Sequence, residues 1–269
     1  MSGPLRTGPS WTDATRLGEA LSADHFSGVA VRIVLTRWPH QAGQLEAGLR
    51  EVGVDVGFLP VTEQRLPQDL GELQAAVADL AAGRVDWLLL TSRTTVWALQ
   101  QAGWDGTVPS GTRIGVTGSG TAQALPRGSE DVWMPHREAS AAGILTCLPD
   151  AEPGERVLLP QSAQARPQLV EGLRASGRDV TQVTAYETVS RVTDGGLPPS
   201  QDPGALGPGD LTDADVVLVT SSSAARAWSQ LKLADGVRPR LLAIGRPTPS
   251  RWLSWGSRHA PWTGCRPAR

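Results

Sequence analysis

The chain has 269 residues, 40% of them hydrophobic, which is enough for one large domain or two of ordinary size. Its 25 basic and 27 acidic residues nearly balance, so the composition does not require nucleic acid or another polyanion as a partner. Cys147 and Cys265 lie far apart, which argues against a disulfide scaffold and a metal site. Neither a signal peptide nor a membrane-spanning apolar run is visible. We therefore expect a cytoplasmic protein without membrane contact.

Short apolar strands alternate with amphipathic helices along the chain. Residues 1–28 are polar and are expected to form a poorly ordered extension with one short helix near 13–21. The patterns predict strands at 31–36, 54–61, 87–90, 113–118, 156–160, 179–189, 216–219 and 241–245. They predict helices at 44–52, 71–83, 95–101, 119–125, 139–148, 166–177 and up to about 231. The segment 193–210 is too rich in Pro and Gly to hold regular structure. This alternation predicts an α/β fold with parallel sheets covered on both faces.

Three segments of the first half recur in the second half in the same order. The matching residues are Asp86, Thr91 and Ser92 with Asp215, Thr220 and Ser221 (215 − 86 = 129), Leu45 and Leu49 with Leu169 and Leu173 (169 − 45 = 124), and Gly118 and Thr121 with Gly245 and Thr248 (245 − 118 = 127). Three echoes at nearly one offset predict two similar domains that arose by internal duplication.

Each repeated element is a strand, a turn of Ser, Thr or Gly, and a helix. In parallel sheets these turns lie at the carboxyl ends of the strands, where ligands bind in open α/β folds. A helix N-terminus has unpaired N–H groups and a partial positive charge, which favour carboxylates and phosphates. Four such turns, two per domain, indicate a ligand with several anionic arms. Alternatively, each Ser or Thr is an ordinary N-cap worth ~1 kcal/mol, and common descent preserved the shared spelling.

Other motifs are incomplete. Gly118 and Gly120 begin a dinucleotide fingerprint, but Gln123 occupies the place of its third glycine, and NAD is not expected. The histidines are scattered without metal-ligand spacing at positions His25, His40, His136 and His259. No nucleophile elbow, P-loop or kinase loop is present in the sequence.

Seven segments occur in the order found in the uroporphyrinogen-III synthase family. They are VLTRWP, LLLTSRTTV, VTGSGTAQAL, RVLLPQSAQARPQL, VTAYETV, DVVLVTSSSAAR and LLAIG followed by Pro-Thr. Each alone is modestly specific, but together they cover about 31–248, and over this length the chain resembles that family. The resemblance implies a cofactor-independent lyase that closes hydroxymethylbilane, a linear tetrapyrrole, into uroporphyrinogen III. Ring D is inverted through a spiro intermediate and water is lost. The many carboxylates of this substrate agree with anion-binding turns.

The resemblance also implies the arrangement of the domains. In this family two similar parallel-sheet domains, flavodoxin-like or Rossmann-like, are joined by a two-stranded ladder with a cleft between them. Carried over to this chain, the crossings are FLPVTEQRL and VTAYETVSR. Domain I is then 29–61 plus 190–269, and domain II is 66–182, inserted into it.

Residue roles follow from matching positions. Tyr186, in AYET, resembles the family's tyrosine beside the cleft, where a neutral phenol can donate a proton to the departing hydroxyl. The alternative is a ladder tyrosine that faces the hinge. The candidate substrate-binding residues are Arg37, Thr91, Ser92, Gly118, Ser119, Thr121, Arg166, Thr220, Ser221, Ser223, Gly245 and Thr248. The two arginines can pair with carboxylates in a bidentate way. Because the pyrrole's own electrons expel the hydroxyl, the protein mainly holds ring D, and no single substitution is expected to abolish activity.

After Thr248 the chain departs from the family, which continues with a long helix, a strand and a final helix. Residues 249–269 contain three of the ten tryptophans, and no acidic residue follows Asp235. This composition favours a truncated or altered terminus, so a non-catalytic tetrapyrrole-binding or regulatory relative is the main alternative. A nucleotide-binding α/β protein is a third. For the enzyme we expect a monomer that contacts hydroxymethylbilane synthase transiently.

Overall fold

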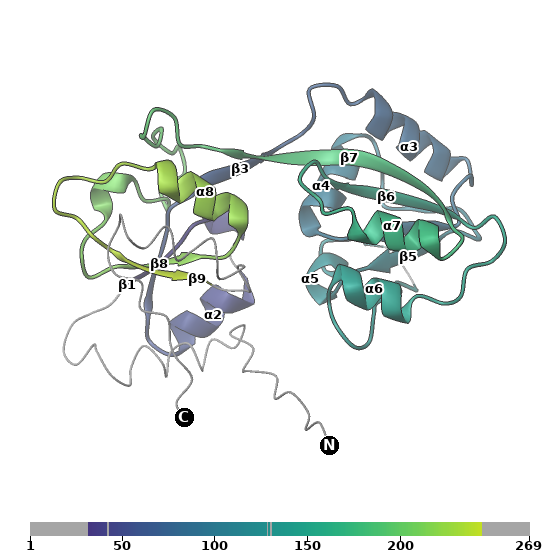
Figure 1. Ribbon diagram of the computed structural model, residues 1–269, viewed down its shortest axis with the longest axis horizontal. Coiled ribbons are helices and arrows are strands. Elements are labelled where there is room, and N and C mark those ends of the chain that lie inside the picture. Colours follow the sequence, from purple (N-terminus) through teal and green to yellow (C-terminus); the bar gives the residue numbers. More distant parts are fainter. Residues whose placement is uncertain (1–31, 42, 128, 130, 244–269) are drawn as a thin grey trace, which may run out of the picture. The chain divides into compact units, whose positions relative to one another are not determined.

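The computed structural model describes residues 32–41, 43–127, 129 and 131–243. Their contacts divide the chain into two units, drawn with their elements in Figure 1. Unit 1 comprises 32–63 and 189–243 of the described residues, and unit 2 comprises 64–188. Several sequence predictions lie outside the described residues. They are the extension at 1–28 with its helix near 13–21, and the residues His25, His259, Gly245 and Thr248.

Unit 1 is built on a parallel sheet with the strand order β2-β1-β8-β9. In chain order its elements are β1 (Arg32–Leu35), η1 (Pro39–Gln41), α2 (Gln44–Glu51), β2 (Asp55–Phe58), η2 (Pro208–Asp210), β8 (Val216–Val219), α8 (Ser222–Gln230) and β9 (Arg240–Ala243). β1 and β8 are the central strands. The helix α2 connects β1 to β2, and α8 connects β8 to β9.

Unit 2 is built on a sheet with the strand order β3-β7-β6-β4-β5. Its elements are β3 (Thr62–Arg65), α3 (Gly71–Ala81), β4 (Trp87–Leu90), α4 (Arg93–Gln101), β5 (Arg113–Val116), α5 (Ser119–Ala122), α6 (Ala141–Cys147), β6 (Arg156–Ser162), α7 (Gln168–Ala175) and β7 (Asp179–Ser190). The pairs β7–β6, β6–β4 and β4–β5 are all parallel. The neighbouring strands β3 and β7 are the elements that run from one unit into the other.

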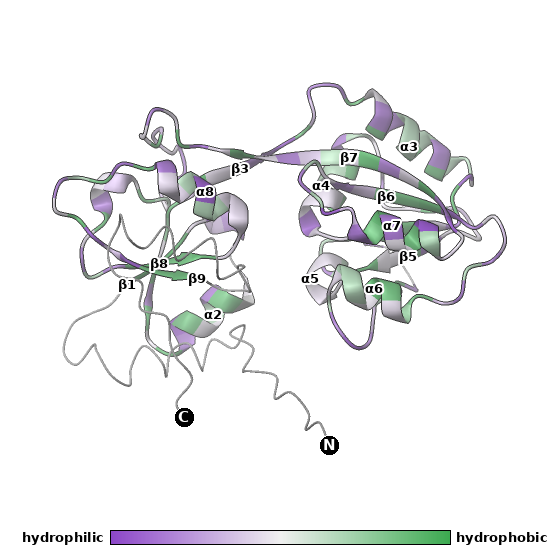
Figure 2. Cartoon of the chain, viewed as in Figure 1, coloured by the Kyte–Doolittle hydropathy of each residue, from purple (hydrophilic) through white to green (hydrophobic). Residues whose placement is uncertain are grey.

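The central strands are buried on both faces. All four residues of β4 (WLLL) and of β8 (VVLV) are buried, and Figure 2 colours β8 as hydrophobic. Successive strand side chains point to opposite faces, so in unit 2 Leu88 packs with α3 and α4, while Leu89 packs with α6 and α7. Strands with such a continuous apolar pattern are typical of parallel sheets, because helices cover both faces of these sheets. The predicted α/β class, with helices on both faces of parallel sheets, is confirmed.

The strand pairing of the two units follows the offsets of the sequence echoes. Ile33 of β1 lies opposite Val216 of β8, and Val157 of β6 lies opposite Trp87 of β4 (157 − 33 = 124; 216 − 87 = 129). On the outer side, β9 pairs with β8 as β5 pairs with β4, with Arg240 and Arg113 as the equivalent first residues (240 − 113 = 127). The strands β2-β1-β8-β9 and β7-β6-β4-β5 therefore share one order and one register.

An aspartate before each central strand binds an arginine of the neighbouring strand. Asp215 accepts from Nε and Nη2 of Arg32 at 2.9 and 3.0 Å, and Asp86 accepts from the same atoms of Arg156 at 3.0 and 2.8 Å. The side-chain and backbone hydrogen bonds from Arg156 hold the pKa of Asp86 below its ordinary value. Burial raises the pKa of Asp215, but hydrogen bonds from Arg32 and Thr212 outweigh it and leave that pKa lowered as well.

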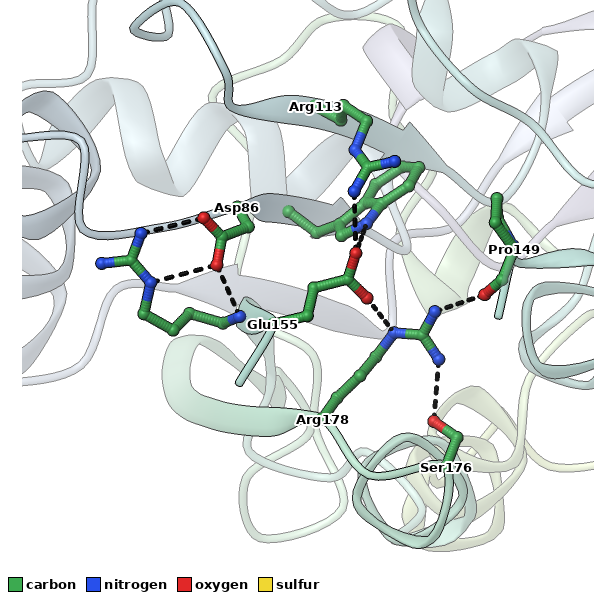
Figure 3. Close-up of polar contacts among 8 residues, drawn as sticks. Asp86, Arg113, Pro149, Glu155, Ser176 and Arg178 are labelled. Atoms are coloured by element: carbon green, nitrogen blue, oxygen red, sulfur yellow. Dashed lines mark hydrogen bonds and ion pairs between the residues drawn. The ribbon is translucent and has the colours of Figure 1, made fainter. Parts of the chain in front are cut away.

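Unit 2 carries a second, buried charged cluster at the amino ends of its strands (Figure 3). Glu155 accepts from Nε of Arg178 at 2.7 Å, from Nη2 of Arg113 at 2.7 Å and from Nε1 of Trp87 at 2.9 Å. Arg178 also donates to the Pro149 carbonyl and to Ser176 Oγ. The side chains of Glu155 and Arg178 are each 4% exposed, so their charges compensate one another away from water.

Two local expectations differ from the structure. The helix predicted at 95–101 begins at Arg93, because Ser92 caps it. The segment 193–210 does hold some regular structure, since it contains η2 and pairs Ala205 with Phe58. Hydrogen bonds fix this segment, including Gly207 N–H to Asp210 Oδ2 at 2.8 Å and Leu206 N–H to the Phe58 carbonyl at 2.6 Å.

Candidate functional site

Hydroxyl and tyrosine side chains collect at the carboxyl edge of the unit 2 sheet. Thr91 and Ser92 follow β4, Gly118 and Ser119 follow β5, and Tyr186 lies in β7 opposite Ser162, the last residue of β6. Since parallel strands end at the same edge, these residues belong to one edge of unit 2. Thr91, Ser92, Gly118, Ser119 and Tyr186 were each predicted as site residues.

Ser92 is the N-cap of α4. Its backbone is extended (φ −157°), and its Oγ accepts from the Thr95 N–H at 3.1 Å, which pairs one of the free N–H groups at the helix start. The same Oγ lies 2.9 Å from Thr95 Oγ1. Ser92 is half-buried, whereas Thr95 is fully buried. The capping explanation is therefore correct for this turn, and it leaves the Ser92 hydroxyl hydrogen for another partner.

The Tyr186 hydroxyl lies 3.2 Å from Ser92 Oγ, and on distance alone either oxygen can donate the hydrogen of this bond. Gln161 pairs with Thr184, but Ser162 pairs with Tyr186, so the register of β6 and β7 shifts by one residue. Strand side chains otherwise alternate between faces. Because of the shift, Tyr186 packs on the same core as Ala185, the core that α4 covers. The irregularity thus brings the phenol to the start of α4.

The β5–α5 turn contributes less. Gly118 is the N-cap of α5, and its carbonyl accepts from the N–H groups of Thr121 and Ala122 at 3.0 and 3.1 Å. A Cβ on Gly118 would lie 2.9 Å from the Cβ of Ala139, so this close approach requires glycine. Ser119 is exposed, but Thr121 is only 7% exposed and presents little surface to a ligand.

The carboxyl edge of the unit 1 sheet repeats the capped turn. Ser221 is the N-cap of α8, and its Oγ accepts from the Ala224 N–H at 3.1 Å and lies 3.0 Å from Ser223 Oγ. Arg37, which follows β1, donates from Nη2 to Thr220 Oγ1 at 3.0 Å. Both Ser221 and its neighbour Ser222 are exposed. Four predicted residues therefore meet at this edge: Arg37, Thr220, Ser221 and Ser223.

Arg166 and Thr95 differ from expectation in opposite ways. Arg166 is exposed before α7 and makes no hydrogen bond or ion pair with the described residues. Thr95 was not predicted as a site residue, although it touches Ser92 through both its backbone and its hydroxyl. A signal was present in the sequence: at the offset of 129, Thr95 matches Ala224, so the two copies of the turn differ there.

The part of the chain that the structure describes contains neither a metal cluster nor a membrane helix. There, no group of three or more His, Cys, Asp or Glu side chains is arranged to hold a metal ion. The His40 ring stacks on Trp38 with the centroids 6.0 Å apart, and His136 is exposed. Among the described helices, none combines the length and apolar character that crossing a bilayer requires.

A polar cavity of about 410 Å³ lies at the other edge of unit 2, at the amino ends of its strands. Its lining includes Asp86, Arg113 and Glu155. Hydrogen bonds from Arg156, Arg178, Arg113 and Trp87 already occupy the carboxylate oxygens of Asp86 and Glu155. This cavity therefore belongs to the charged network that fastens the strands and is separate from the hydroxyl-bearing edge.

The fold and the two edges define an α/β protein in which α4 and α8 each begin at a serine-capped turn after a parallel strand, with a tyrosine beside the cap of α4. A family model described as uroporphyrinogen-III synthase HemD matches residues 43–260. The chloroplastic uroporphyrinogen-III synthase of Oryza sativa subsp. japonica is 31% identical over 232 residues, covering 83% of this chain and 72% of the relative. The chain belongs to the uroporphyrinogen-III synthase family. The family match continues beyond Thr248 into the segment where the sequence pattern departs.

Two solved structures are similar to this one. The crystal structure of uroporphyrinogen-III synthetase from Helicobacter pylori aligns with a TM-score of 0.51 at 16% identity, covering 86% of this chain and 91% of that chain. A mutant uroporphyrinogen III synthase from the extremely thermophilic bacterium Thermus thermophilus aligns with a TM-score of 0.48 at 21% identity, covering 84% and 90%. The first likeness supports the fold.

Proposed function

We propose that the protein is a uroporphyrinogen-III synthase, a cyclising lyase that converts hydroxymethylbilane into uroporphyrinogen III with inversion of ring D and loss of water. Membership of that family, matched over residues 43–260, carries this conclusion. The contact between Tyr186 and Ser92 at a helix start supports it, because it places a proton donor beside N–H groups that favour carboxylates. No cofactor is needed for this reaction.

The proposed substrate-binding positions lie at the carboxyl edges of the two sheets. The proposed domains are 29–61 plus 190–269 and 66–182, similar in fold and joined by a ladder of β3 and β7. The exposed hydroxyls of Ser221 and Ser222 and the half-buried hydroxyl of Ser92 support this placement, since a substrate with many carboxylates needs several anion-binding positions. The proposed ligands of its arms are Arg37, Thr91, Ser92, Gly118, Ser119, Thr121, Arg166, Thr220, Ser221, Ser223, Gly245 and Thr248.

In the proposed reaction, the nitrogen of the pyrrole ring that carries the hydroxymethyl group supplies the electron pair that breaks the C–O bond of that group. Tyr186 donates a proton, so that the departing oxygen leaves as water. The substituted carbon of ring D attacks the resulting cation to form the spiro intermediate, which then rearranges. The proton that the ring system loses at final closure returns to the phenolate, which restores Tyr186. The protein otherwise holds ring D over that carbon and excludes direct closure.

The test generates hydroxymethylbilane in situ, adds the protein, and separates the isomers by chromatography. Isomer III above the spontaneous isomer I supports the synthase, whereas isomer I alone supports a non-catalytic relative. Tyr186→Phe is expected to lower kcat by about 10²-fold without abolishing activity, because a general acid contributes on that order. An unchanged kcat would remove Tyr186 from the mechanism while leaving the assignment of the enzyme intact.

We also propose a cytoplasmic monomer that receives its substrate by transient contact with hydroxymethylbilane synthase. The substrate closes spontaneously to isomer I, so a short path between the two proteins would preserve it. Sedimentation of the purified protein tests the monomer. For the transfer, the lag before isomer III appears in the coupled reaction should be shorter than free diffusion between the two enzymes allows. A lag equal to the diffusion value would contradict direct contact.

A further inference from the structure

Three hydroxyls form a continuous chain at the start of α4. The Tyr186 hydroxyl lies 3.2 Å from Ser92 Oγ, and Ser92 Oγ lies 2.9 Å from Thr95 Oγ1. Ser92 Oγ also accepts from the Thr95 N–H at 3.1 Å. Distances alone do not assign the hydrogens of these groups, but their burial and their partner counts do.

Thr95 fixes one end of the chain. It is 0% exposed, and within the described residues Ser92 Oγ is the hydrogen-bond partner of its hydroxyl. A buried O–H group without an acceptor loses its bond to water and gains nothing in return, which is costly. Thr95 therefore donates its hydroxyl hydrogen to Ser92.

Only one partner then remains for the hydrogen of the Ser92 hydroxyl. A serine hydroxyl has two lone pairs and one hydrogen. The Thr95 N–H and the Thr95 O–H occupy both lone pairs, so Ser92 donates its own hydrogen to the Tyr186 oxygen. The phenol accepts this bond, and its own hydrogen points away from Ser92.

We propose that Ser92 and Thr95 are positioning residues that orient the Tyr186 hydroxyl, so that its proton faces the substrate and the phenolate left after transfer is stabilised by the Ser92 O–H. This inference rests on the proposed function, in which Tyr186 is the proton donor. The bond from Ser92 strengthens as negative charge develops on the phenol oxygen, because hydrogen bonds to ionised acceptors are the stronger ones. It therefore acts on the rate of the chemical step more than on binding.

The other copy of the turn shows what capping alone requires. In unit 1, Ser221 caps α8 with the same 3.1 Å bond to a backbone N–H, but the residue equivalent to Thr95 is Ala224 (224 − 95 = 129). The residue equivalent to Tyr186 is Thr62 (186 − 62 = 124). A cap of this kind forms without a hydroxyl at the third helical position. The Thr95 hydroxyl is therefore not required for capping, and its role is the hydrogen bond to Ser92, which in turn bonds to Tyr186.

A first experiment observes the bond directly. Tyr186 is the single tyrosine of the chain, so protein grown with ¹³Cζ-tyrosine gives one resonance from a carbon bonded to the phenol oxygen. Ser92→Ala and Thr95→Val should shift this resonance, and Thr95→Ser should restore it. Ser140→Ala is the matched control, since Ser140 caps α6 of the same unit with a 3.1 Å bond and does not touch Tyr186. An unshifted resonance in Ser92→Ala would overturn the proposal.

A second experiment measures isomer III formation. Thr95→Val should lower kcat about 5-fold with KM nearly unchanged, since one hydrogen bond contributes on this order. Thr95→Ser should retain the wild-type kcat. In a Tyr186→Phe background, Thr95→Val should cause no further loss, because its effect acts through the phenol. An equal loss in both backgrounds would show a merely structural role and overturn the proposal. If Tyr186→Phe is itself fully active, the proton-donor role fails, and the resonance still decides whether Ser92 and Thr95 position the phenol.

Discussion

Units 1 and 2 share a four-stranded frame but differ at both edges of it. Each frame has an aspartate bound by an arginine at the amino edge and a serine cap at the carboxyl edge. Unit 2 adds a buried pair, Glu155 with Arg178, and the contact between Ser92 and Tyr186. In the sequence, valine occupies positions 31 and 54, which match 155 and 178 at the offset of 124.

This difference separates two kinds of feature. What both units share follows from needs common to any parallel sheet, namely fastening neighbouring strands and pairing the free N–H groups at helix starts. A feature that only one unit has, such as the Glu155–Arg178 pair, cannot follow from these shared needs and must serve a purpose specific to that unit. The chain thus contains its own reference, because a substitution can turn an element of unit 2 into its counterpart in unit 1.

The largest effect is expected from the buried pair of unit 2. Glu155→Gln removes the negative charge but keeps the size, and so leaves the buried Arg178 guanidinium without a counter-charge. Removing one partner of a buried pair costs ~3–5 kcal/mol of unfolding free energy. Urea unfolding followed by tryptophan fluorescence measures the loss, which amide hydrogen exchange should assign to unit 2.

The unit 1 residues provide the control. Glu155→Val and Arg178→Val should each be strongly destabilising, and the double variant should lose less than the sum of the two, because an apolar pair leaves no uncompensated charge. Trp87 and Arg113 lose an acceptor in the double variant, so full recovery is not expected. Additive losses would mean that the charges of Glu155 and Arg178 are not coupled, against the 2.7 Å contact between them.

The repeated aspartate–arginine pairs should give an intermediate and unequal effect. The Asp215 side chain is 2% exposed and that of Asp86 is 33% exposed, so water screens the second pair more. Asp215→Asn weakens hydrogen bonds to a charged group and should cost ~1.5–3 kcal/mol. Asp86→Asn should cost clearly less. Equal losses in urea unfolding would show that burial does not distinguish the two pairs.

The same pairs predict a dependence on pH. Both aspartates have a pKa below the ordinary value in the folded protein, so the unfolded chain takes up protons first as the pH falls through ~4. Their contribution is complete at neutral pH and is lost as the pH falls through the folded pKa. The difference in unfolding free energy between wild type and Asp215→Asn should be constant above pH ~5 and shrink below it. A difference that persists unchanged into acid would contradict the role of the charge.

Much of the four-stranded frame could be predicted from the sequence, because the interactions that define its strands and helix starts involve residues close together in the chain. β4 and β8 are apolar runs that end at Thr-Ser. A strand that is buried on both faces needs apolar side chains at every position, so such a run predicts it directly. Serine at the expected cap positions is equally local, since a cap bonds to a backbone N–H three residues later.

What could not be predicted depends on contacts between distant segments. The pair of Asp86 with Arg156 requires β6 to lie beside β4, although β5 follows β4 in the chain. The position of the Tyr186 hydroxyl depends on the register shift beside Ser162, which no residue pattern announces. The burial of Glu155 is not evident from the sequence, because an isolated glutamate predicts an exposed side chain.

The smallest effect is expected at two equivalent glycines that end helices. Gly53 (φ +78°) and Gly177 (φ +88°) follow α2 and α7 at the offset of 124 (177 − 53 = 124). Each helix ends with the same two backbone bonds, which are Gly53 N–H to the Arg50 carbonyl and Val54 N–H to the Leu49 carbonyl in unit 1, with the matching pair in unit 2. A Cβ at either glycine would meet nothing within 4 Å. The cost of alanine is therefore that of the left-handed backbone alone, ~1–2 kcal/mol.

Gly53→Ala and Gly177→Ala should consequently lose nearly the same unfolding free energy, whereas hydrogen exchange should increase in unit 1 for the first and in unit 2 for the second. Gly209→Ala is the control, because that position is exposed, has open space around it and needs no left-handed backbone. Losses that differ by more than ~1 kcal/mol would exceed the spread expected for one shared conformation. Such a difference would mean that the two helix ends share a sequence pattern and a backbone conformation but contribute differently to the stability of their units.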